Sequence, residues 1–560
     1  MKILGFADNH DSSAAVVVDG KVVAACGQER IDRVKNSGAF PWGAIDAVLD
    51  QAGLRYRDID RVVCGSAFTP SFLLRRFPEL HKQRKQGGGQ FSYALNLYFA
   101  YQSALRNSGL HGLEVEACRK LLADRLEERP FQVTRVDMVD HHTAHAEAAY
   151  RTQPRSRCLV VTVDAMGDGQ SVTVRSGQDG HLTLLYGQSG LAAINTYYSR
   201  TTEYLGFKPN RHEGKITGLA AYAQPPDALL DHYRGLLHFV GPGLSTLNML
   251  ARHGPQDAFY RVLERYSREE IAAALQQVLE EALTDLAAHW VAQTGIADVA
   301  VCGGVFANVK LNQRIAQLSC VDSLWVYPNM GDGGLAAGGA LAAAAPAPKT
   351  LDTLYLGPSY KQNEIARELN IAGLRPKKPK DLARQVAQLL ADGKVVARCA
   401  GSMEWGPRAL GNRTLFYRPD DPSVNDWLNK RLNRTEFMPF APCVLAEDAE
   451  ELFEGYAKAP QAARFMTVCF DAKPPMAALG RGVVHIDGTA RPQVVHAEDN
   501  PEVHDILRHF RELTGLPALI NTSFNLHEEP IVCSPFDAIR AWKQGGLDAL
   551  AIGPYLVQAG

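Results

Sequence analysis

The sequence has 560 residues, of which 46% are hydrophobic and 21% are charged, as in soluble globular proteins that are too long for one hydrophobic core. The formal net charge of −2 does not imply a duplex-binding surface, although it leaves room for a local basic cleft, and no apolar run is long enough to span a bilayer. The ten cysteines form no C-x-x-C pair and the N-terminus enters a strand without signal-peptide architecture, so we expect a cytoplasmic protein without a zinc ribbon or a disulfide framework.

The N-terminal region predicts alternating strands and helices around a small polar loop. Residues 8–13 are small and polar and separate two apolar strands, so their amides and side chains can face a ligand. The basic, glycine-containing segment 75–89 is interpreted as a surface insertion rather than a catalytic element. Strands are expected at 3–6, 14–18, 21–26, 59–64 and 133–139, and helices at 41–52 and 113–126.

A pair of histidines, His141 and His145, follows the strand at 133–139. In a helix this spacing stacks two imidazoles on one face, one turn apart, which suits two nitrogen ligands of one metal ion. The next apolar strand, 159–163, ends in Asp164. This combination favours an active site, and the alternative is a pair of capping or core histidines.

A second strand-hairpin unit follows Asp164, with strands at 171–175 and 182–186. Such units thus occur twice, at 3–26 and 159–186, and helical periodicity dominates 257–294. Two such units with interleaved helices are expected of an ATPase with two lobes around a cleft. Strands at 299–302 and 325–328 feed Gly303-Gly304 and Gly331–Gly334, whose backbone amides can approach a phosphate. Neither is a Walker A loop, and each alone is equally consistent with an ordinary tight turn.

Two further residues of this half are candidates for chemistry. Asp332 lies where a carboxylate can complete the histidine pair as a third ligand of iron, manganese or zinc, and its alternative role is a helix N-cap. Lys215 lies inside a glycine-containing frame, where it is either a contact to a nucleotide or acceptor or a solvated turn lysine.

The second half of the chain is a separate α/β unit rich in arginine loops. Residues 343–349 predict a linker, 350–375 a bridging segment, and a helix at 382–390 and a strand at 394–399 open the second unit. We therefore expect domains at 1–348 and 380–560, joined by 349–379. Arginines on loops beside Asn, Thr and Ser donors fit a small anionic ligand better than a polynucleotide, although surface ion pairs are the alternative. These candidates are Arg408, Arg413, Arg431, Arg434, Arg491 and Asn521.

Together these motifs resemble the nodulation-type and antibiotic-tailoring O-carbamoyltransferases from end to end. The matching stretches are His10–Ala15, His141–His142 with His145–Ala146, Asp164, Gly214–Lys215 with Gly218–Ala220, Gly303–Val305, Asp332, Gly406–Gly411, Pro439–Pro442, and Asn521–Asn525 with Glu529–Ile531. The resemblance implies an α/β fold with an N-terminal actin-like ATPase lobe, which is a duplicated ribonuclease-H-like unit. It also implies a C-terminal α/β lobe similar to threonylcarbamoyl-adenylate synthase.

The family implies a two-step reaction. In the C-terminal lobe, carbamoyl phosphate and ATP give carbamoyl-adenylate, with Mg²⁺ as the partner of ATP. In the N-terminal lobe, a hydroxyl of a small-molecule acceptor, such as a natural product or sugar, takes the carbamoyl group and AMP leaves. No nucleic-acid or membrane partner is expected, and the family analogy leans towards a homodimer.

The resemblance also implies roles for individual residues. His141, His145 and Asp332 correspond to metal ligands, typically of iron; His10 corresponds to a general base for the acceptor hydroxyl, and Asp164 to a catalytic or metal-proximal carboxylate, with Lys215 as a further catalytic candidate. The nucleotide loops of the N-terminal lobe are represented by Gly303, Gly304, Asn308 and Gly331. The carbamoyl phosphate and ATP site of the C-terminal lobe is represented by Arg408, Arg413, Arg431, Arg434, Arg491, Asn521, Ser523 and His527.

Three positions depart from the family pattern. Some members have Arg where this chain has Met438, Lys where it has Leu432, and Arg where it has His527. Nearby Arg431 and Arg434, with His527 itself, are candidates for compensating, and the departures leave open a different carbamoyl-type donor.

Two alternative functions remain at this stage. One is tRNA modification by a fused synthase and transferase, against which count the near-neutral charge and the lack of an interleaved aromatic and basic surface. The other is a non-catalytic nucleotide-binding protein of the actin-like superfold. The histidine pair with a third carboxylate counts against it, because a passive ATP switch needs only Mg²⁺.

Overall fold

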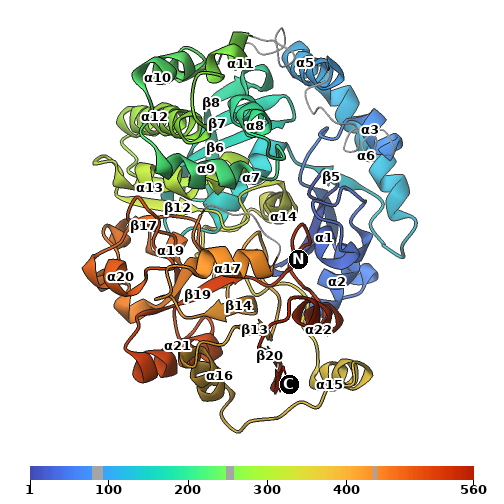
Figure 1. Cartoon of the computed structure of the whole chain (residues 1–560). Helices are drawn as coiled ribbons and strands as arrows, with labels where there is room; N and C mark the ends of the chain where they lie inside the picture. The colour runs from blue at the N-terminus through green and yellow to red at the C-terminus, as the bar shows by residue number, and fades with distance from the viewer. Residues whose placement is uncertain (79–92, 247–257, 433–437, 560) are drawn as a thin grey trace.

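The computed structural model describes residues 1–78, 93–246, 258–432 and 438–559, which build three main β-sheets (Figure 1). The first sheet has the strand order β3-β2-β1-β4-β5 and the second has the order β8-β7-β6-β11-β12. The strands of the first sheet are β1 (Lys2–Ala7), β2 (Ser13–Val18), β3 (Lys21–Gly27), β4 (Arg61–Cys64) and β5 (Val136–Met138). Those of the second are β6 (Arg157–Gly167), β7 (Gln170–Gln178), β8 (His181–Ser189), β11 (Asp298–Cys302) and β12 (Ser323–Val326).

The two sheets repeat one topology. In each sheet the first three strands run antiparallel to one another, and the first strand then pairs in parallel with the fourth, which pairs in parallel with the fifth. This is the duplicated ribonuclease-H-like arrangement of an actin-like lobe, so the predicted fold class is confirmed for this N-terminal lobe. The hairpin expected in each repeat is present, as β2–β3 in the first sheet and β7–β8 in the second.

Helices α7 (His141–Arg151) and α14 (Leu335–Ala344) pack against each other between the sheets. The apolar run from Leu335 forms α14, which is buried along most of its length because it also contacts β1, β2 and β4. Gly338 permits the close approach, since a Cβ there would collide with the Ala144 carbonyl. Among the described residues, no helix combines the length and apolar character needed to cross a membrane.

The C-terminal lobe is built on a seven-stranded mixed sheet of order β18-β15-β19-β14-β13-β20-β21. Its strands are β13 (Val396–Cys399), β14 (Arg413–Tyr417), β15 (Ala441–Leu445), β18 (Gln493–Val495), β19 (Ala518–Ser523), β20 (Ala549–Ile552) and β21 (Tyr555–Gln558). Helices α16 (Leu382–Ala391) and α21 (Pro501–Thr514) pack on the sheet through one apolar cluster. The helix and strand expected at the start of this unit are therefore confirmed.

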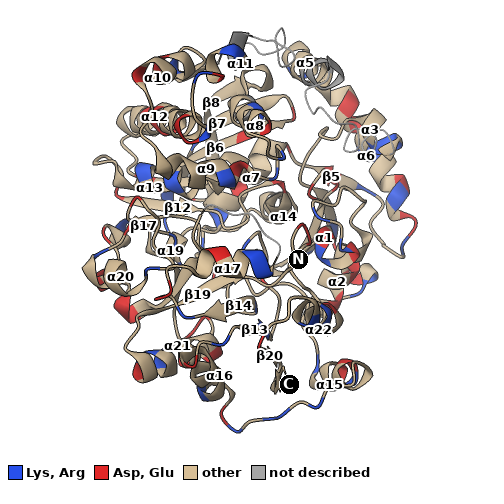
Figure 2. Cartoon of the chain, viewed as in Figure 1, with Lys and Arg blue, Asp and Glu red and all other residues tan. Residues whose placement is uncertain are grey.

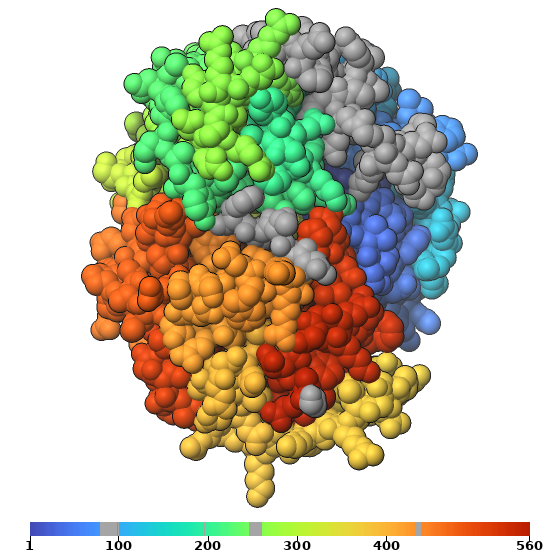
Figure 3. Space-filling view, in the orientation of Figure 1, coloured from blue at the N-terminus to red at the C-terminus, as the bar shows by residue number. Residues whose placement is uncertain are grey.

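Segment 345–361 connects the lobes without a helix or strand and lies along both of them. Ala25 of β3 donates to the Leu356 carbonyl, and Trp405 donates to the Leu354 carbonyl. Helix α15 (Gln362–Ile371) follows in the segment predicted to bridge the two units. On the face drawn in Figure 3, the C-terminal lobe lies against both the green and the blue parts of the N-terminal lobe.

One interpretation of the sequence of the N-terminal lobe is wrong. Arg75, assigned to an exposed insertion, is buried at the end of α3 (Phe72–Arg76), and its guanidinium donates to both oxygens of Asp8 at 2.9 Å. The neighbouring basic residues in the sequence suggested a solvated segment, and only the long-range contact to Asp8 shows otherwise. The rest of the proposed insertion, from residue 79, lies outside the described residues. Elsewhere Lys and Arg are interspersed with Asp and Glu over the elements (Figure 2).

Candidate metal centre and cavity between the lobes

The two histidines of the H-x-x-x-H motif lie on one face of α7, as predicted. Asp140 caps the helix by accepting from the Thr143 backbone N–H (2.9 Å), which makes His141 its first residue. The Nε2 atoms of His141 and His145 lie 3.2 Å and 3.1 Å from Asp164 Oδ2, which lies near the end of β6. The helix and the strand therefore converge at these three side chains.

Asp332 reaches the same point from the turn before α14. Its Oδ1 lies 3.5 Å from His141 Nε2 and 3.8 Å from His145 Nε2, while its Oδ2 accepts from the Asn9 side chain (2.9 Å). The N-cap role is wrong, because Gly331 occupies the cap position and Asp332 begins the helical turn. One ligand atom from each of His141, His145, Asp164 and Asp332 lies within 4.8 Å of the others.

This metal cluster, defined as His141, His145, Asp164 and Asp332, suits a divalent transition metal. Two imidazole nitrogens with two carboxylate oxygens are a donor set that iron, manganese or zinc accepts. Burial alone would raise the pKa of Asp164, but hydrogen bonds from the two histidines hold it well below its usual value. Burial opposes protonation of His141 and His145, yet the neighbouring carboxylates, with Cys302 beside His145, raise the pKa of both. The surroundings of the two imidazoles therefore favour positive charge at this point, as a metal site requires.

The third histidine of the motif, His142, fits the alternative of a core histidine. Its Nδ1 lies 2.7 Å from Thr162 Oγ1 and its Nε2 lies 3.1 Å from the Gln170 carbonyl. Burial and the neighbouring histidines lower the pKa of His142 to about 3, so it stays neutral. The motif thus divides into two candidate ligands and one packing residue.

His10 approaches the metal cluster from the loop after β1. Its Nδ1 lies 3.4 Å from Asp332 Oδ2, and its side chain is 53% exposed. A solvent-accessible imidazole beside the cluster can exchange a proton with a bound molecule. His10 is thus brought together with the cluster, as the resemblance implied.

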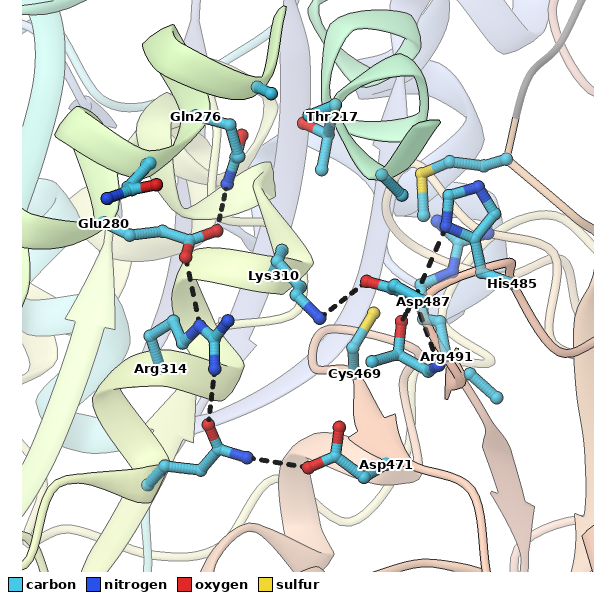
Figure 4. A pocket seen from close by; sticks show the side chains of 18 of the residues that line it. Thr217, Gln276, Glu280, Lys310, Arg314, Cys469, Asp471, His485, Asp487 and Arg491 are labelled. Carbon is cyan, nitrogen blue, oxygen red and sulfur yellow. Dashed lines mark hydrogen bonds and ion pairs between the residues drawn. The ribbon is translucent and has the colours of Figure 1, made fainter. Parts of the chain in front are cut away.

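A cavity of about 680 Å³ opens between the two lobes (Figure 4). The N-terminal lobe contributes α9 (Glu213–Leu219), α12 (Arg268–Thr294) and α13 (Val309–Gln317), and the C-terminal lobe contributes the segments around 438–440 and 469–491. Ion pairs line its walls: Lys310 donates to Asp487 across the two lobes (2.8 Å), and Arg314 pairs with Glu280 within the N-terminal lobe (3.0 Å). Arg491, predicted to bind an anion, lines the cavity on the C-terminal side.

Chain comparisons bear on this two-lobed arrangement. Residues 2–341 match the family described as Carbamoyltransferase N-terminus, and residues 387–559 match Carbamoyltransferase C-terminus. The chain belongs to the carbamoyltransferase family. Nodulation protein NolNO of Sinorhizobium fredii is 30% identical over 98% of this chain and 79% of its own length. An uncharacterized Synechocystis protein is 30% identical over 98% and 95%.

Among solved structures, component A of the Acidaminococcus fermentans (R)-2-hydroxyglutaryl-CoA dehydratase covers 62% of the carbamoyltransferase chain and 99% of its own, at 16% identity and a TM-score of 0.35. The P. abyssi Sua5 structure covers 30% and 48%, at 14% identity and a TM-score of 0.22. The fold described above rests on the strand order itself.

The glycine loops of the carbamoyltransferase crowd the metal cluster. Gly303 has φ +109° and donates to the Met330 carbonyl, and a Cβ on Gly303 would collide with the Val163 carbonyl. A Cβ on Gly304 would lie 3.1 Å from Asp164 Oδ1, whereas Gly331 has open space around it. The loops after β11 and β12 therefore lie at the cluster.

Asn308 and Lys215 lie toward the lobe junction instead. Asn308 caps α13 and exchanges two hydrogen bonds with Gln276, a residue of the cavity wall. Lys215 is buried on α9, 5.8 Å from the centre of the Phe207 ring, so the solvated-turn alternative is wrong. A Cβ on Gly218 of the same helix would meet Met438, which places α9 against the C-terminal lobe.

Buried side chains of the C-terminal lobe hydrogen-bond to the backbone of the Gly406–Gly411 loop. Glu404 accepts the backbone N–H groups of Leu410, Asn412 and Arg413, and the Asn521 amide donates to the Ala409 carbonyl. Arg413 is buried and donates to several backbone carbonyls, including those of Ala400 and Cys533. In this structure Asn521 contacts the loop directly, Arg413 anchors the strand that follows it, and Arg408 is half-buried on the loop.

The remaining C-terminal candidates are dispersed. Arg431 pairs with Asp548 beside the start of β20, at the end of the sheet opposite Arg413. Ser523 donates to the Asn525 side chain (2.6 Å), and His527 lies 3.9 Å from Glu528. Arg434 lies outside the described residues.

Sequence reasoning missed several residues that surround the cluster. Asn9 donates to Asp332, and Asp168 accepts the His141 backbone N–H (2.8 Å). Burial, with Glu29 nearby, raises the pKa of Asp11 to about 6. Asn9 and Asp11 flank His10 in the polar loop that the sequence marked, whereas Asp168-Gly169 had the signature of an ordinary turn.

Proposed function

We propose that this carbamoyltransferase makes carbamoyl-adenylate in its C-terminal lobe and transfers the carbamoyl group, in its N-terminal lobe, to a hydroxyl of a small molecule. We assign residues 1–348 to the transfer domain, 349–379 to the connection and 380–560 to the adenylate-forming domain. The observation that carries the proposal is the metal cluster within a family member whose two lobes share one polar cavity.

The first step consumes ATP and carbamoyl phosphate. Water cleaves carbamoyl phosphate to carbamate and phosphate, and a carbamate oxygen then attacks the α-phosphorus of ATP and expels pyrophosphate. Arg408 and Arg491 are suited to hold these anions, since guanidinium groups bind phosphate oxygens in pairs. Glu404 and Asn521 keep the Arg408 loop in place through their contacts to its backbone.

The second step takes place beside the cluster. The acceptor oxygen attacks the carbamoyl carbon, the bond to the AMP phosphate oxygen breaks, and the hydroxyl proton needs an acceptor. His10 suits this role: if its Nδ1–H donates to Asp332, its Nε2 is left basic and reachable from solvent.

His141, His145 and Asp332, with Asp164 alongside, are the residues that would hold a divalent ion, for which we propose Fe²⁺. Such an ion would supply positive charge for the phosphate of the leaving AMP.

The test is product analysis. Purified protein incubated with ATP, Mg²⁺, carbamoyl phosphate and a panel of alcohols and sugars is expected to release pyrophosphate, AMP and one carbamoylated product. Omission of carbamoyl phosphate is the control and should abolish AMP release. Failure to form AMP with any carbamoyl donor would contradict the proposal.

A further inference from the structure

Each histidine of the metal cluster has a second ring nitrogen that points away from the carboxylates. His141 Nδ1 lies 3.2 Å from Ser66 Oγ, and His145 Nδ1 lies 3.3 Å from Cys302 Sγ. All four side chains are buried, with at most 1% of each residue exposed. Ser66 follows β4 and Cys302 ends β11, so the two partners come from different sheets.

Both partners contact a further group that can only accept. Ser66 Oγ lies 3.5 Å from Asp168 Oδ1, and the Asp168 carboxylate also accepts the backbone N–H groups of Ala67 and Phe68 at 2.7 and 2.9 Å. Cys302 Sγ lies 3.4 Å from the Met330 carbonyl oxygen. A carbonyl oxygen carries no proton, and the Asp168 carboxylate already accepts the backbone N–H groups of Ala67, Phe68 and His141, so the hydroxyl and the thiol are the donors in these two contacts.

The direction of each hydrogen-bond chain then follows. Because the Ser66 and Cys302 protons are committed to Asp168 and Met330, their lone pairs face the imidazoles and accept from Nδ1–H. A neutral imidazole with its proton on Nδ1 has its lone pair on Nε2. In both histidines this is the nitrogen that faces Asp164 and Asp332.

We propose that Ser66 and Cys302 are positioning residues that fix His141 and His145 in the tautomer whose Nε2 binds the metal. This inference rests on the metal cluster of the proposed function. Partners of this kind orient a ligand ring and raise its basicity, and their loss typically costs ten- to a hundredfold in metal affinity. The chain through Ser66 ends on a carboxylate and the one through Cys302 on a neutral carbonyl, so we expect the Ser66 variant to lose more.

Cobalt(II) titration of the metal-free protein, followed by visible ligand-field absorption, tests the proposal. We expect Cys302→Ala to lower Co²⁺ affinity about tenfold or more and Ser66→Ala to lower it further. Cys302→Ser should recover most of the affinity, because a hydroxyl can form the same chain. Cys158→Ala is the matched control, since Cys158 is an equally buried strand cysteine in the adjacent strand β6 that no described hydrogen bond joins to the metal cluster.

The outcomes separate this inference from the metal centre itself. Stoichiometric Co²⁺ binding by the wild type with unchanged affinity in Cys302→Ala would overturn the role of Cys302 alone, as would a serine variant as weak as the alanine variant. A wild type that binds no Co²⁺ would overturn the metal centre and this inference with it. If Cys302→Ala does not fold, Cys302→Val, which keeps the volume but forms no hydrogen bond, replaces it against Cys302→Ser.

Discussion

The two halves of the N-terminal lobe place a carboxylate at the same point of one repeated topology and use it differently. Cys64 of β4 is paired with Phe6 of β1, and Cys302 of β11 with Thr162 of β6. Asp8 and Asp164 follow Phe6 and Thr162 by two residues, so they are equivalent positions.

Each carboxylate–cysteine pair contacts one basic side chain. In the first half, Arg75 donates to Asp8 (2.9 Å) and to Cys64 (3.5 Å). In the second half, His145 contacts both Asp164 (3.1 Å) and Cys302 (3.3 Å). A guanidinium stays charged and is not displaced, whereas an imidazole can release its proton and bind a metal. The duplicated fold therefore supplies two equivalent sites, here called corners: Asp8, Cys64 and Arg75 form the first, and Asp164, Cys302 and His145 form the second. Only the second corner can release its proton and bind a metal cation.

The largest expected effect is on the first corner. Arg75→Ala leaves Asp8 buried without its partner and should lower the free energy of unfolding by about 3–5 kcal/mol. Chemical denaturation measures the loss. Arg76→Ala is the control: Arg76 is the exposed neighbour of Arg75, and its replacement should change the free energy of unfolding by less than about 0.5 kcal/mol. An Arg75→Ala protein as stable as the control would show that the Asp8 corner needs no cation.

The second corner should respond to pH through its metal affinity. His141 and His145 have raised pKa values, so protons compete with the metal below those values and affinity falls as pH falls. If each ion displaces two protons, affinity should drop by roughly a hundredfold per pH unit in that range. Co²⁺ titrations at several pH values would check this slope, and an affinity independent of pH would exclude the histidines as ligands.

A smaller effect is expected from crowding the ligand ring. A Cβ on Gly167 would collide with the ring of His141, so Gly167→Ala should displace that ligand and destabilise the protein by about 1–3 kcal/mol. Thermal unfolding and Co²⁺ affinity are the measurements. Gly112→Ala, on helix α6 (His111–Leu126) with open space around it, is the matched control and should be neutral or slightly stabilising. Full Co²⁺ affinity in Gly167→Ala would contradict the assigned position of His141.

The smallest effect sharpens the comparison of the two cysteines. Cys64→Ala should leave Co²⁺ affinity nearly unchanged, because the Cys64 thiol contacts Arg75 and the backbone carbonyl of Ser66 but neither metal-binding histidine. The same substitution at Cys302 should weaken binding. Equal losses at both positions would show that the effect comes from packing rather than from the contact to His145.

Local patterns were enough to predict much of this molecule. Alternating apolar strands and their turns indicated both hairpin units, and the four-residue spacing of His141 and His145 indicated their shared helix face. Asp332 was singled out as the carboxylate of the glycine-rich loop that follows the strand at 325–328.

Long-range contacts decided what the sequence could not show. Arg75 lies among basic neighbours that suggested an exposed segment, and its burial depends on Asp8, 67 residues away. Ser66 and Cys302 carry no motif of their own, and their role depends on strands from two sheets converging on α7. The sequence placed Arg413 among the anion ligands because it follows a glycine-containing loop. Its actual partners are backbone carbonyls, which no side-chain pattern reveals.

The central claim, that the metal cluster serves transfer while the C-terminal lobe forms the adenylate, is tested most directly by the half-reactions of His145→Ala. Carbamoyl phosphate-dependent exchange of pyrophosphate into ATP should stay near the wild-type rate, while formation of carbamoylated product should fall by at least about a hundredfold. His181→Ala, on the exposed end of β8, should leave both unchanged. Equal loss of exchange and transfer in His145→Ala would contradict the division between the two lobes.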